Sequence, residues 1–197
     1  DYKAIVNCNN QVVTECTGKT ACDPMTLTCK NACEVTVATK QSVGCEYYAT
    51  DMHSNKPAAC FAAFVANTWN EPAKLTVEYN GNVLPVANFA RIPSGQGQSL
   101  SYAPYNESTG IPPGEVAILF LSQGNDNVTC PAPPAVKDVG LSGTGIGQSF
   151  KITSDVPVVA YQINPFGGGS AAVRGASLLL PVSSWDTNYV AVNAYGY

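Results

Sequence analysis

Residues 74–89, KLTVEYNGNVLPVANF, carry the clearest structural signal in the chain. In KLTVEY (74–79) apolar and polar side chains alternate, which places three apolar residues on one face of a strand and three polar residues toward water. The Asn80-Gly81 pair that follows favours a type I′ turn, because both positions of that turn need a positive φ. The rest of the stretch returns as a second strand, and Pro85, which lacks an N–H, places that strand at a sheet edge or a bulge. The stretch therefore predicts a β-hairpin.

Other apolar segments of strand length flank this hairpin, separated by Gly, Pro and Asn. They are ACFAAFVA (59–66, a strand or a short buried helix), EVAILFLS (115–122), QSFKITS (148–154), VPVVAYQIN (156–164), ASLLLPV (176–182) and NYVAVNAY (188–195). No long segment shows a helical stripe with caps. Short strands with such punctuation predict an all-β fold of the antiparallel sandwich type.

Composition narrows the class of protein. The chain has 197 residues, 12% of them charged, with a net charge of −4 and no basic cluster, which argues against a nucleic-acid partner. No run of 18 uncharged apolar residues occurs, so we expect no transmembrane segment. The start, DYKAIVNCNN, shows no signal peptide, so either none existed or it has been removed.

The cysteines are concentrated near the N-terminus, with six of the eight in the first 45 residues. This density predicts disulfide bonds and an oxidising compartment. Zinc is the alternative, but no C-x2-C pair occurs. Eight cysteines allow 105 pairings, so the sequence leaves the pairing open. The predicted disulfide cysteines are Cys8, Cys16, Cys22, Cys29, Cys33, Cys45, Cys60 and Cys130.

These patterns divide the chain into three predicted parts. Residues 1–45 form a small disulfide-rich head, in which NCNNQVVTEC (7–16) is typical of a short hairpin. Residues 46–137 form a β-sandwich-like module, and residues 138–197 form a second β module that is incomplete by strand count. A head of this size needs its disulfide bridges, because it cannot bury a sufficient core of its own.

Two glycine-rich stretches of the sequence lack the motifs of phosphate-binding loops. The triplet Gly167–Gly169 lacks the Lys of a P-loop, and GTGIGQS (143–149) has Gln148 where a dinucleotide fingerprint needs its last glycine. Both stretches are therefore interpreted as loops between strands, and no cofactor is expected.

No catalytic or metal-binding constellation emerges from the sequence. His53 is the one histidine, in a polar loop with Asp51 and Ser54, and we interpret it as a solvated side chain. GNDN (124–127) is interpreted as a surface turn rather than a calcium site. Asn106 and Asn127 begin N-x-S/T sequons, which would be glycosylation candidates in a eukaryotic secreted protein.

Aromatic residues are the remaining candidates for a binding surface. The chain has ten Tyr and two Trp, and such side chains are frequent anchors at interfaces. The alternative is that the tyrosines are half-buried on sheet faces. The candidate surface-binding aromatics are Tyr47, Tyr48, Trp69, Tyr102, Tyr105 and Trp185.

Six segments together carry a family resemblance. They are GCEYYATDM (44–52), ACFAAFVANTW (59–69), FARIPSGQGQSLSYAP (89–104), IPPGEVAILFLS (111–122), GTGIGQSFKITSDVPVVAYQINPFGGG (143–169) and SLLLPVSSWDTNYVAVNA (177–194). The chain resembles the IgGFc-binding protein N-terminal domain family, in particular its bacterial branch of secreted or lipid-anchored surface proteins. The resemblance implies an extracellular binding or structural protein whose β domain extends past residue 197. It implies no specific binding or catalytic residue, and Fc binding is not carried over.

Taken together, the sequence predicts a non-enzymatic extracellular or cell-surface protein that acts in adhesion or surface structure. Its expected partners are other protein chains or surface glycans. One alternative is a self-assembling subunit of a surface filament or layer, in which DYKAIV (1–6) or NYVAVNAYGY (188–197) is shared between chains. The other alternative is a carbohydrate-binding β-sandwich that uses exposed Trp or Tyr side chains.

Overall fold

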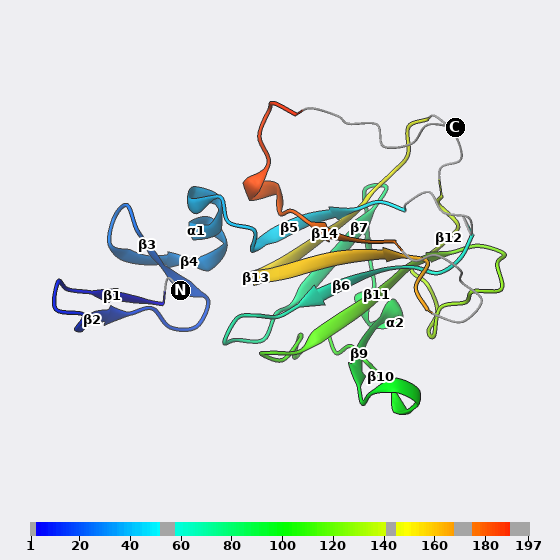
Figure 1. Cartoon of the computed structure of the whole chain (residues 1–197), viewed down its shortest axis with the longest axis horizontal. Coiled ribbons are helices and arrows are strands. Elements are labelled where there is room, and N and C mark those ends of the chain that lie inside the picture. Colours follow the sequence, from blue (N-terminus) through cyan, green and yellow to red (C-terminus); the bar gives the residue numbers. More distant parts are fainter. Residues whose placement is uncertain (1–2, 52–57, 141–144, 168–174, 190–197) are drawn as a thin grey trace.

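The structure is a computed structural model that describes residues 3–51, 58–140, 145–167 and 175–189. A small head lies at one end of a larger β body (Figure 1). The head contains β1 (Ala4–Val6), β2 (Val12–Glu15), β3 (Thr20–Asp23), β4 (Thr28–Asn31) and α1 (Ala32–Thr39). Two antiparallel hairpins, β1–β2 and β3–β4, precede the helix.

The body is built mostly from antiparallel strands with three short helices. Its elements are β5 (Gly44–Ala49), β6 (Phe61–Ala66), β7 (Leu75–Tyr79), β8 (Asn82–Leu84), α2 (Val86–Phe89), β9 (Ala90–Ser94), η1 (Gly97–Ser99), β10 (Ser101–Pro104), β11 (Val116–Gln123), β12 (Val136–Lys137), β13 (Phe150–Asn164), β14 (Gly175–Leu179) and η2 (Val182–Ser184). The predicted all-β, disulfide-containing antiparallel fold is confirmed.

The long strand β13 belongs to two sheets. Its first part pairs with β5 on one side and with β7 on the other, and β8 follows β7; this is the small sheet. Its second part lies between β14 and β6, and the order continues through β11, β9 and β10; this is the large sheet. The register of β13 with β5 shifts between Thr153 and Val158. Segments 148–154 and 156–164, predicted as two strands, are therefore one strand that passes from one sheet into the other.

The predicted boundary between modules 46–137 and 138–197 is wrong. β13 comes from the second predicted module, yet it is hydrogen-bonded to β5, β6 and β7 of the first. Both segments also contribute to one buried core, for example through Phe61 and Phe150, whose ring centroids are 6.3 Å apart. The body is a single unit because the strand that joins its two sheets comes late in the sequence.

Burial on the large sheet explains why segment 59–66 is apolar on both alternating faces. Phe61, Ala63 and Val65 face the main core between the two sheets. Ala62 lies in a second cluster on the opposite face of the same sheet, and Phe64 packs against that cluster. The segment is a strand covered on both faces, one of the two structures that the sequence allowed.

The hairpin of residues 74–89 forms as predicted through its turn. Asn80 and Gly81 have φ values of 49° and 75°, the two positive angles that a type I′ turn requires. β8 is the last strand of the small sheet. Its strand ends at Leu84, and Pro85 precedes the short helix α2, so the returning strand is shorter than predicted.

Three disulfides are present, which corrects the prediction that all eight cysteines are paired. They join Cys16 to Cys29, Cys33 to Cys45, and Cys60 to Cys130. Cys8 and Cys22 are free thiols. Cys8 is exposed whereas Cys22 is buried, and the strand partner of Cys22 is Cys29, which is already bonded to Cys16.

The head contains one helix that the sequence patterns did not predict. α1 is eight residues long and lacks a regular apolar stripe, so periodicity gives no signal for it. Its N-terminus is capped by Asn31, whose side chain accepts a hydrogen bond from the Cys33 N–H at 2.9 Å. The other head prediction is confirmed, because β1 and β2 pair as a hairpin with Asn10 at a φ of 60° in the turn.

Some sequence predictions lie outside the described residues. They concern His53 and Ser54, Gly168 and Gly169 of the glycine triplet, and residues 190–195 of the last predicted strand. Within the described part of the chain, no helix has the length and apolar character needed to cross a membrane.

Candidate functional site

Two of the six candidate aromatics are buried, so the prediction that they form a binding surface is wrong for them. Tyr47 is 0% exposed; its hydroxyl donates to the Val158 carbonyl at 2.5 Å and accepts from the Gly44 N–H at 2.9 Å. Burial raises the pKa of Tyr47 to about 12. Tyr105 is also buried, and its hydroxyl accepts from the Leu75 N–H at 3.0 Å. Burial also raises the pKa of Tyr105. Both hydroxyls satisfy backbone groups inside the body.

The four other candidate aromatics are partly exposed but lie at three separate places. Tyr48 of β5 and Trp185, which follows η2, contact each other with ring centroids 5.7 Å apart. Tyr102 of β10 packs edge-on against Phe120 on the large sheet, at 6.2 Å. Trp69, in the connection between β6 and β7, donates from its indole Nε1 to the Gly18 carbonyl of the head at 2.9 Å. The aromatics therefore do not form one common binding surface.

A polar cluster lies where β5 ends, near the predicted loop of His53. The Asp51 carboxylate accepts hydrogen bonds from the Ser122 hydroxyl at 3.0 Å and from the Asn164 side-chain amide at 2.6 Å. Ser122 is 0% exposed, so its hydroxyl is not accessible to a substrate. These bonds tie the end of β5 to β11 and β13. Across the described ranges, no group of three or more His, Cys, Asp or Glu side chains is placed to hold a metal ion.

The outer face of the large sheet, opposite the main core, is covered at one end. The proline-rich loop after β11 crosses it and is held by the disulfide between Cys60 and Cys130. Two further contacts fix this cover: the Cys60 N–H donates to the Val128 carbonyl at 3.0 Å, and the Phe166 N–H donates to the Cys60 carbonyl at 2.7 Å. Phe166 packs edge-on against Phe120 with centroids 5.1 Å apart. This end of the face is a buried apolar cluster.

The other end of the same face forms a groove with a volume of about 320 Å³. We call it the apolar groove, and its side chains come from β6, β11, β13 and β14. It is formed by Phe64, Ala66, Val116, Tyr161, Ile163 and Ala176. Gln162 also contributes to the wall, but its side-chain carbonyl accepts from the Thr50 N–H at 3.0 Å, on the side away from the groove. Apart from the Tyr161 hydroxyl, the side chains that a partner meets here are apolar.

Strand register shows why these side chains form one surface. Tyr161 is paired with Phe64 on β6 and with Leu178 on β14, and Phe64 is paired with Ile118 on β11. The four therefore form an apolar row across four strands on one face. Tyr161 is 45% exposed and Leu178 is 48% exposed. Within the described residues, the strand partner of β14 is β13, so β14 lies at one end of the large sheet, beside the row.

The sequence patterns did not single out Tyr161 or Leu178 as candidate site residues. A signal was present, because VPVVAYQIN and ASLLLPV are apolar on both alternating faces. In a sheet with a single core, one of those faces would meet water. Which part of that second face a loop covers depends on the disulfide of Cys60, and that pairing is not readable from sequence.

The fold and the groove define an all-β, disulfide-linked protein with an apolar surface on one sheet. Comparison of the chain with protein-family models, with curated proteins and with solved structures found no match. The resemblance to the IgGFc-binding family therefore stays a prediction.

Proposed function

We propose that this chain is a non-enzymatic extracellular protein of adhesion or surface structure, and that it acts by binding another protein chain through the apolar groove. The observation that carries the proposal is the exposed row of Tyr161 and Leu178 beside the groove. Contiguous exposed apolar surface is costly in water and marks interaction sites on soluble proteins. A partner that covers this row removes apolar area from water.

Further support comes from the disulfides and from the sequence. Three disulfides fit a protein made in an oxidising compartment, such as the outside of the cell. The resemblance to the bacterial surface branch of the IgGFc-binding family implies the same location and a binding or structural role. The groove favours a protein partner over a glycan, because its lining is mostly aliphatic and aromatic and the Tyr161 hydroxyl is the polar group of its exposed row.

The test uses the change Tyr161→Arg, which places a charge in the centre of the exposed row. We would coat beads with the oxidised chain and measure their attachment to a panel of immobilised extracellular matrix and mucus proteins. Tyrosine is a frequent hot-spot residue, so the variant should lose affinity about 30-fold or more. The matched control is Tyr189→Arg, since Tyr189 is 71% exposed and lies outside the groove.

Two results would contradict the proposal. One is attachment that is equal in wild type, Tyr161→Arg and Tyr189→Arg, because the groove would then have no part in binding. The other is hydrolysis of a defined peptide or glycan that is lost in His53→Ala, because the chain would then be an enzyme.

A second candidate function is self-assembly into a filament or layer, and the place of β14 at one end of the large sheet, with Leu178 48% exposed, favours it. An exposed strand edge accepts a strand from a neighbouring chain. Light-scattering mass after size-exclusion chromatography separates the two candidates. A mass of 20.6 kDa at every concentration identifies a monomer that binds a different partner. A mass that grows with concentration identifies self-assembly, provided that Tyr161→Arg or a proline substitution within β14 abolishes this growth.

A further inference from the structure

A second hollow, with a different set of lining residues from the apolar groove, lies at the seam between the head and the body. We call it the seam pocket. Its volume is about 280 Å³, just below the range of about 300–1,000 Å³ that is usual for small-molecule sites. Its walls come from the head helix α1, from the connection between β6 and β7, and from β13. A pocket of this volume accommodates one small ligand or one residue of a larger ligand.

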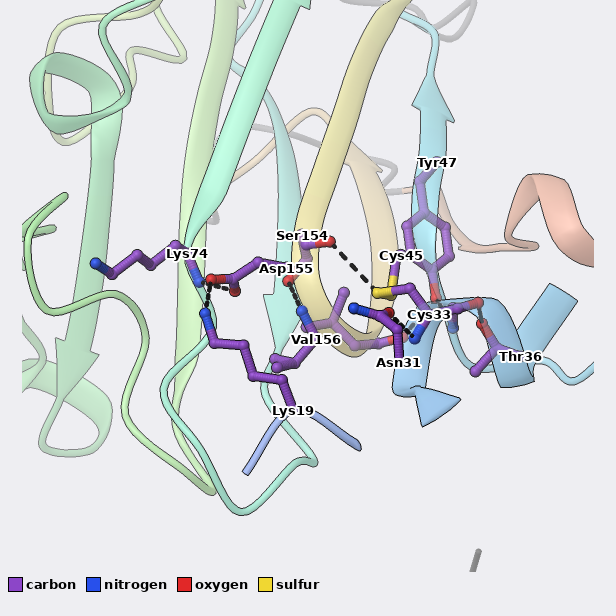
Figure 2. Close-up of a disulfide and its surroundings, with 12 residues drawn as sticks. Lys19, Asn31, Cys33, Thr36, Cys45, Tyr47, Lys74, Ser154, Asp155 and Val156 are labelled. Carbon is purple, nitrogen blue, oxygen red and sulfur yellow. Dashed lines mark hydrogen bonds and ion pairs between the residues drawn. A yellow bond between two sulfur atoms is a disulfide. The ribbon is translucent and has the colours of Figure 1, made fainter. Parts of the chain in front are cut away.

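Contacts between residues of the head and residues of the body hold the seam together. The Lys19 ammonium pairs with the Asp155 carboxylate, and the same carboxylate accepts from the Lys74 N–H at 2.7 Å (Figure 2). The disulfide of Cys33 and Cys45 joins α1 to β5 beside them. The walls of the seam pocket are therefore fixed before a ligand arrives, which lowers the entropic cost of binding.

The lining combines one aromatic side chain with several polar ones. Trp69 lines the pocket and is held in place by the hydrogen bond from its indole to Gly18. Ala21, Ala32 and Val35, which form the small apolar cluster of the head, lie against it. The polar side chains of the lining are Lys3, Thr36, Gln41 and Thr68.

The polar side chains supply both donors and acceptors. Thr36 is 6% exposed, and its hydroxyl donates to the Cys33 carbonyl at 2.8 Å, which leaves the oxygen able to accept (Figure 2). The Gln41 amide donates one N–H to the Thr39 hydroxyl at 2.8 Å. A primary amide carries a second N–H and a carbonyl oxygen as well. The lining includes one ammonium group and no carboxylate.

We propose that the seam pocket binds a single sugar residue of a glycan. A pyranose ring has an apolar C–H face and a rim of hydroxyls, each of which both donates and accepts. The C–H face suits the negative π face of Trp69, and the hydroxyls suit Thr36, Gln41 and Thr68. This site is separate from the apolar groove, so it stands or falls independently of the proposed function.

Two other ligand classes fit the lining less well. An aliphatic chain would cover the second N–H of the Gln41 amide and the accepting side of the Thr36 hydroxyl without offering either a hydrogen bond, which is costly. A cation would need a carboxylate for charge compensation, whereas the charged group in the lining is the Lys3 ammonium. A sugar residue uses both the aromatic and the polar parts.

The experiment takes advantage of the two tryptophans of the chain. In a Trp185→Phe background, Trp69 is the one source of indole fluorescence. We would titrate this protein with the methyl glycosides of glucose, galactose, mannose, N-acetylglucosamine and sialic acid. We expect at least one of them to change the Trp69 emission with a Kd on the order of 1 mM, as is reasonable for so small a ligand.

Two pocket variants and one control make the result specific. Thr36→Val keeps the side-chain volume, removes the hydroxyl and should weaken binding about tenfold. Val43→Phe fills the pocket from its wall and should abolish binding. Thr76→Val makes the same change as the first variant on the exposed face of β7 and should leave binding unchanged. Trp69→Ala is avoided, since it would also loosen the head.

The outcomes are separable. A sugar titration that Val43→Phe abolishes and Thr76→Val does not would establish the site. The proposal is overturned if no glycoside changes the emission of the folded protein, or if binding survives Val43→Phe with the far-ultraviolet circular dichroism unchanged.

Discussion

Replacing Tyr47 with Phe should destabilise the body strongly, although the change removes only one oxygen atom. That oxygen donates to the Val158 carbonyl and accepts from the Gly44 N–H in a fully buried position (Figure 2 shows the Tyr47 side chain on β5). In Tyr47→Phe both backbone groups lose their partner where water does not reach them. Each buried unsatisfied group costs about 1–3 kcal/mol, so we expect a loss of about 2–4 kcal/mol in the free energy of unfolding.

Urea unfolding of the oxidised protein, followed by circular dichroism, measures this loss as a lower midpoint at unchanged slope. Tyr105→Phe is a graded comparison, because its hydroxyl accepts from one backbone group, the Leu75 N–H, and should cost about 1–3 kcal/mol. Tyr48→Phe is the control, since this half-buried ring packs on Trp185 and should change stability by less than about 0.5 kcal/mol.

The raised pKa of Tyr47 adds an independent readout. The folded protein holds this proton up to a pKa of about 12, whereas the ordinary value is 10.0. The protonated Tyr47 hydroxyl therefore stabilises the folded protein fully below pH 10, and this stabilisation is lost as the pH rises toward 12. Tyr47→Phe should make this alkaline loss of stability shallower. A Tyr47→Phe protein as stable as Tyr48→Phe, with an unchanged alkaline profile, would refute the role of the buried hydroxyl.

Three further predictions concern acid stability, a disulfide and a turn. The Lys30 ammonium and neighbouring hydrogen bonds hold the pKa of Asp23 at about 2, so melting temperature should fall as the pH drops from about 4 to about 2, and Asp23→Asn should flatten that fall. Replacing Cys60 and Cys130 together with Ala opens a loop with a sequence separation of 70 and should cost about 4 kcal/mol in urea unfolding. Gly110→Ala should cost about 2 kcal/mol or more in the same assay, since φ is +76° and the new Cβ would lie 2.6 Å from a backbone oxygen.

Each of these changes has a matched control in the chain. Glu15→Gln removes an exposed carboxylate from the same head and should leave the acid profile steeper than Asp23→Asn does. Removing the disulfide of Cys33 and Cys45, with a separation of 12, should cost less, about 3 kcal/mol. Gly81→Ala tests positive φ alone, because its Cβ meets open space, and should cost about 1 kcal/mol. Reversal of any of these orders would contradict the corresponding argument.

The sequence by itself determined the local features of the protein. The alternation of apolar and polar residues in 74–79 predicts a strand, because it decides which side chains avoid water. The Asn80-Gly81 pair predicts the turn, because these two residues tolerate positive φ angles. The cysteine density of the head indicated disulfides before any pairing was known. The sequence patterns did not predict the short helix α1, because eight residues without an apolar stripe leave almost no periodic signal.

Only the tertiary structure decided how these elements combine. β13 pairs with β5, which lies about a hundred residues earlier in the chain, and no local pattern specifies that partner. Tyr47 of β5, which the sequence offered as a surface residue, is buried there, whereas Tyr161, in the part of β13 between β14 and β6, is exposed. The physical reason is that exposure is a property of what packs on a face. An apolar strand face looks the same in sequence whether a core, a loop or another molecule covers it.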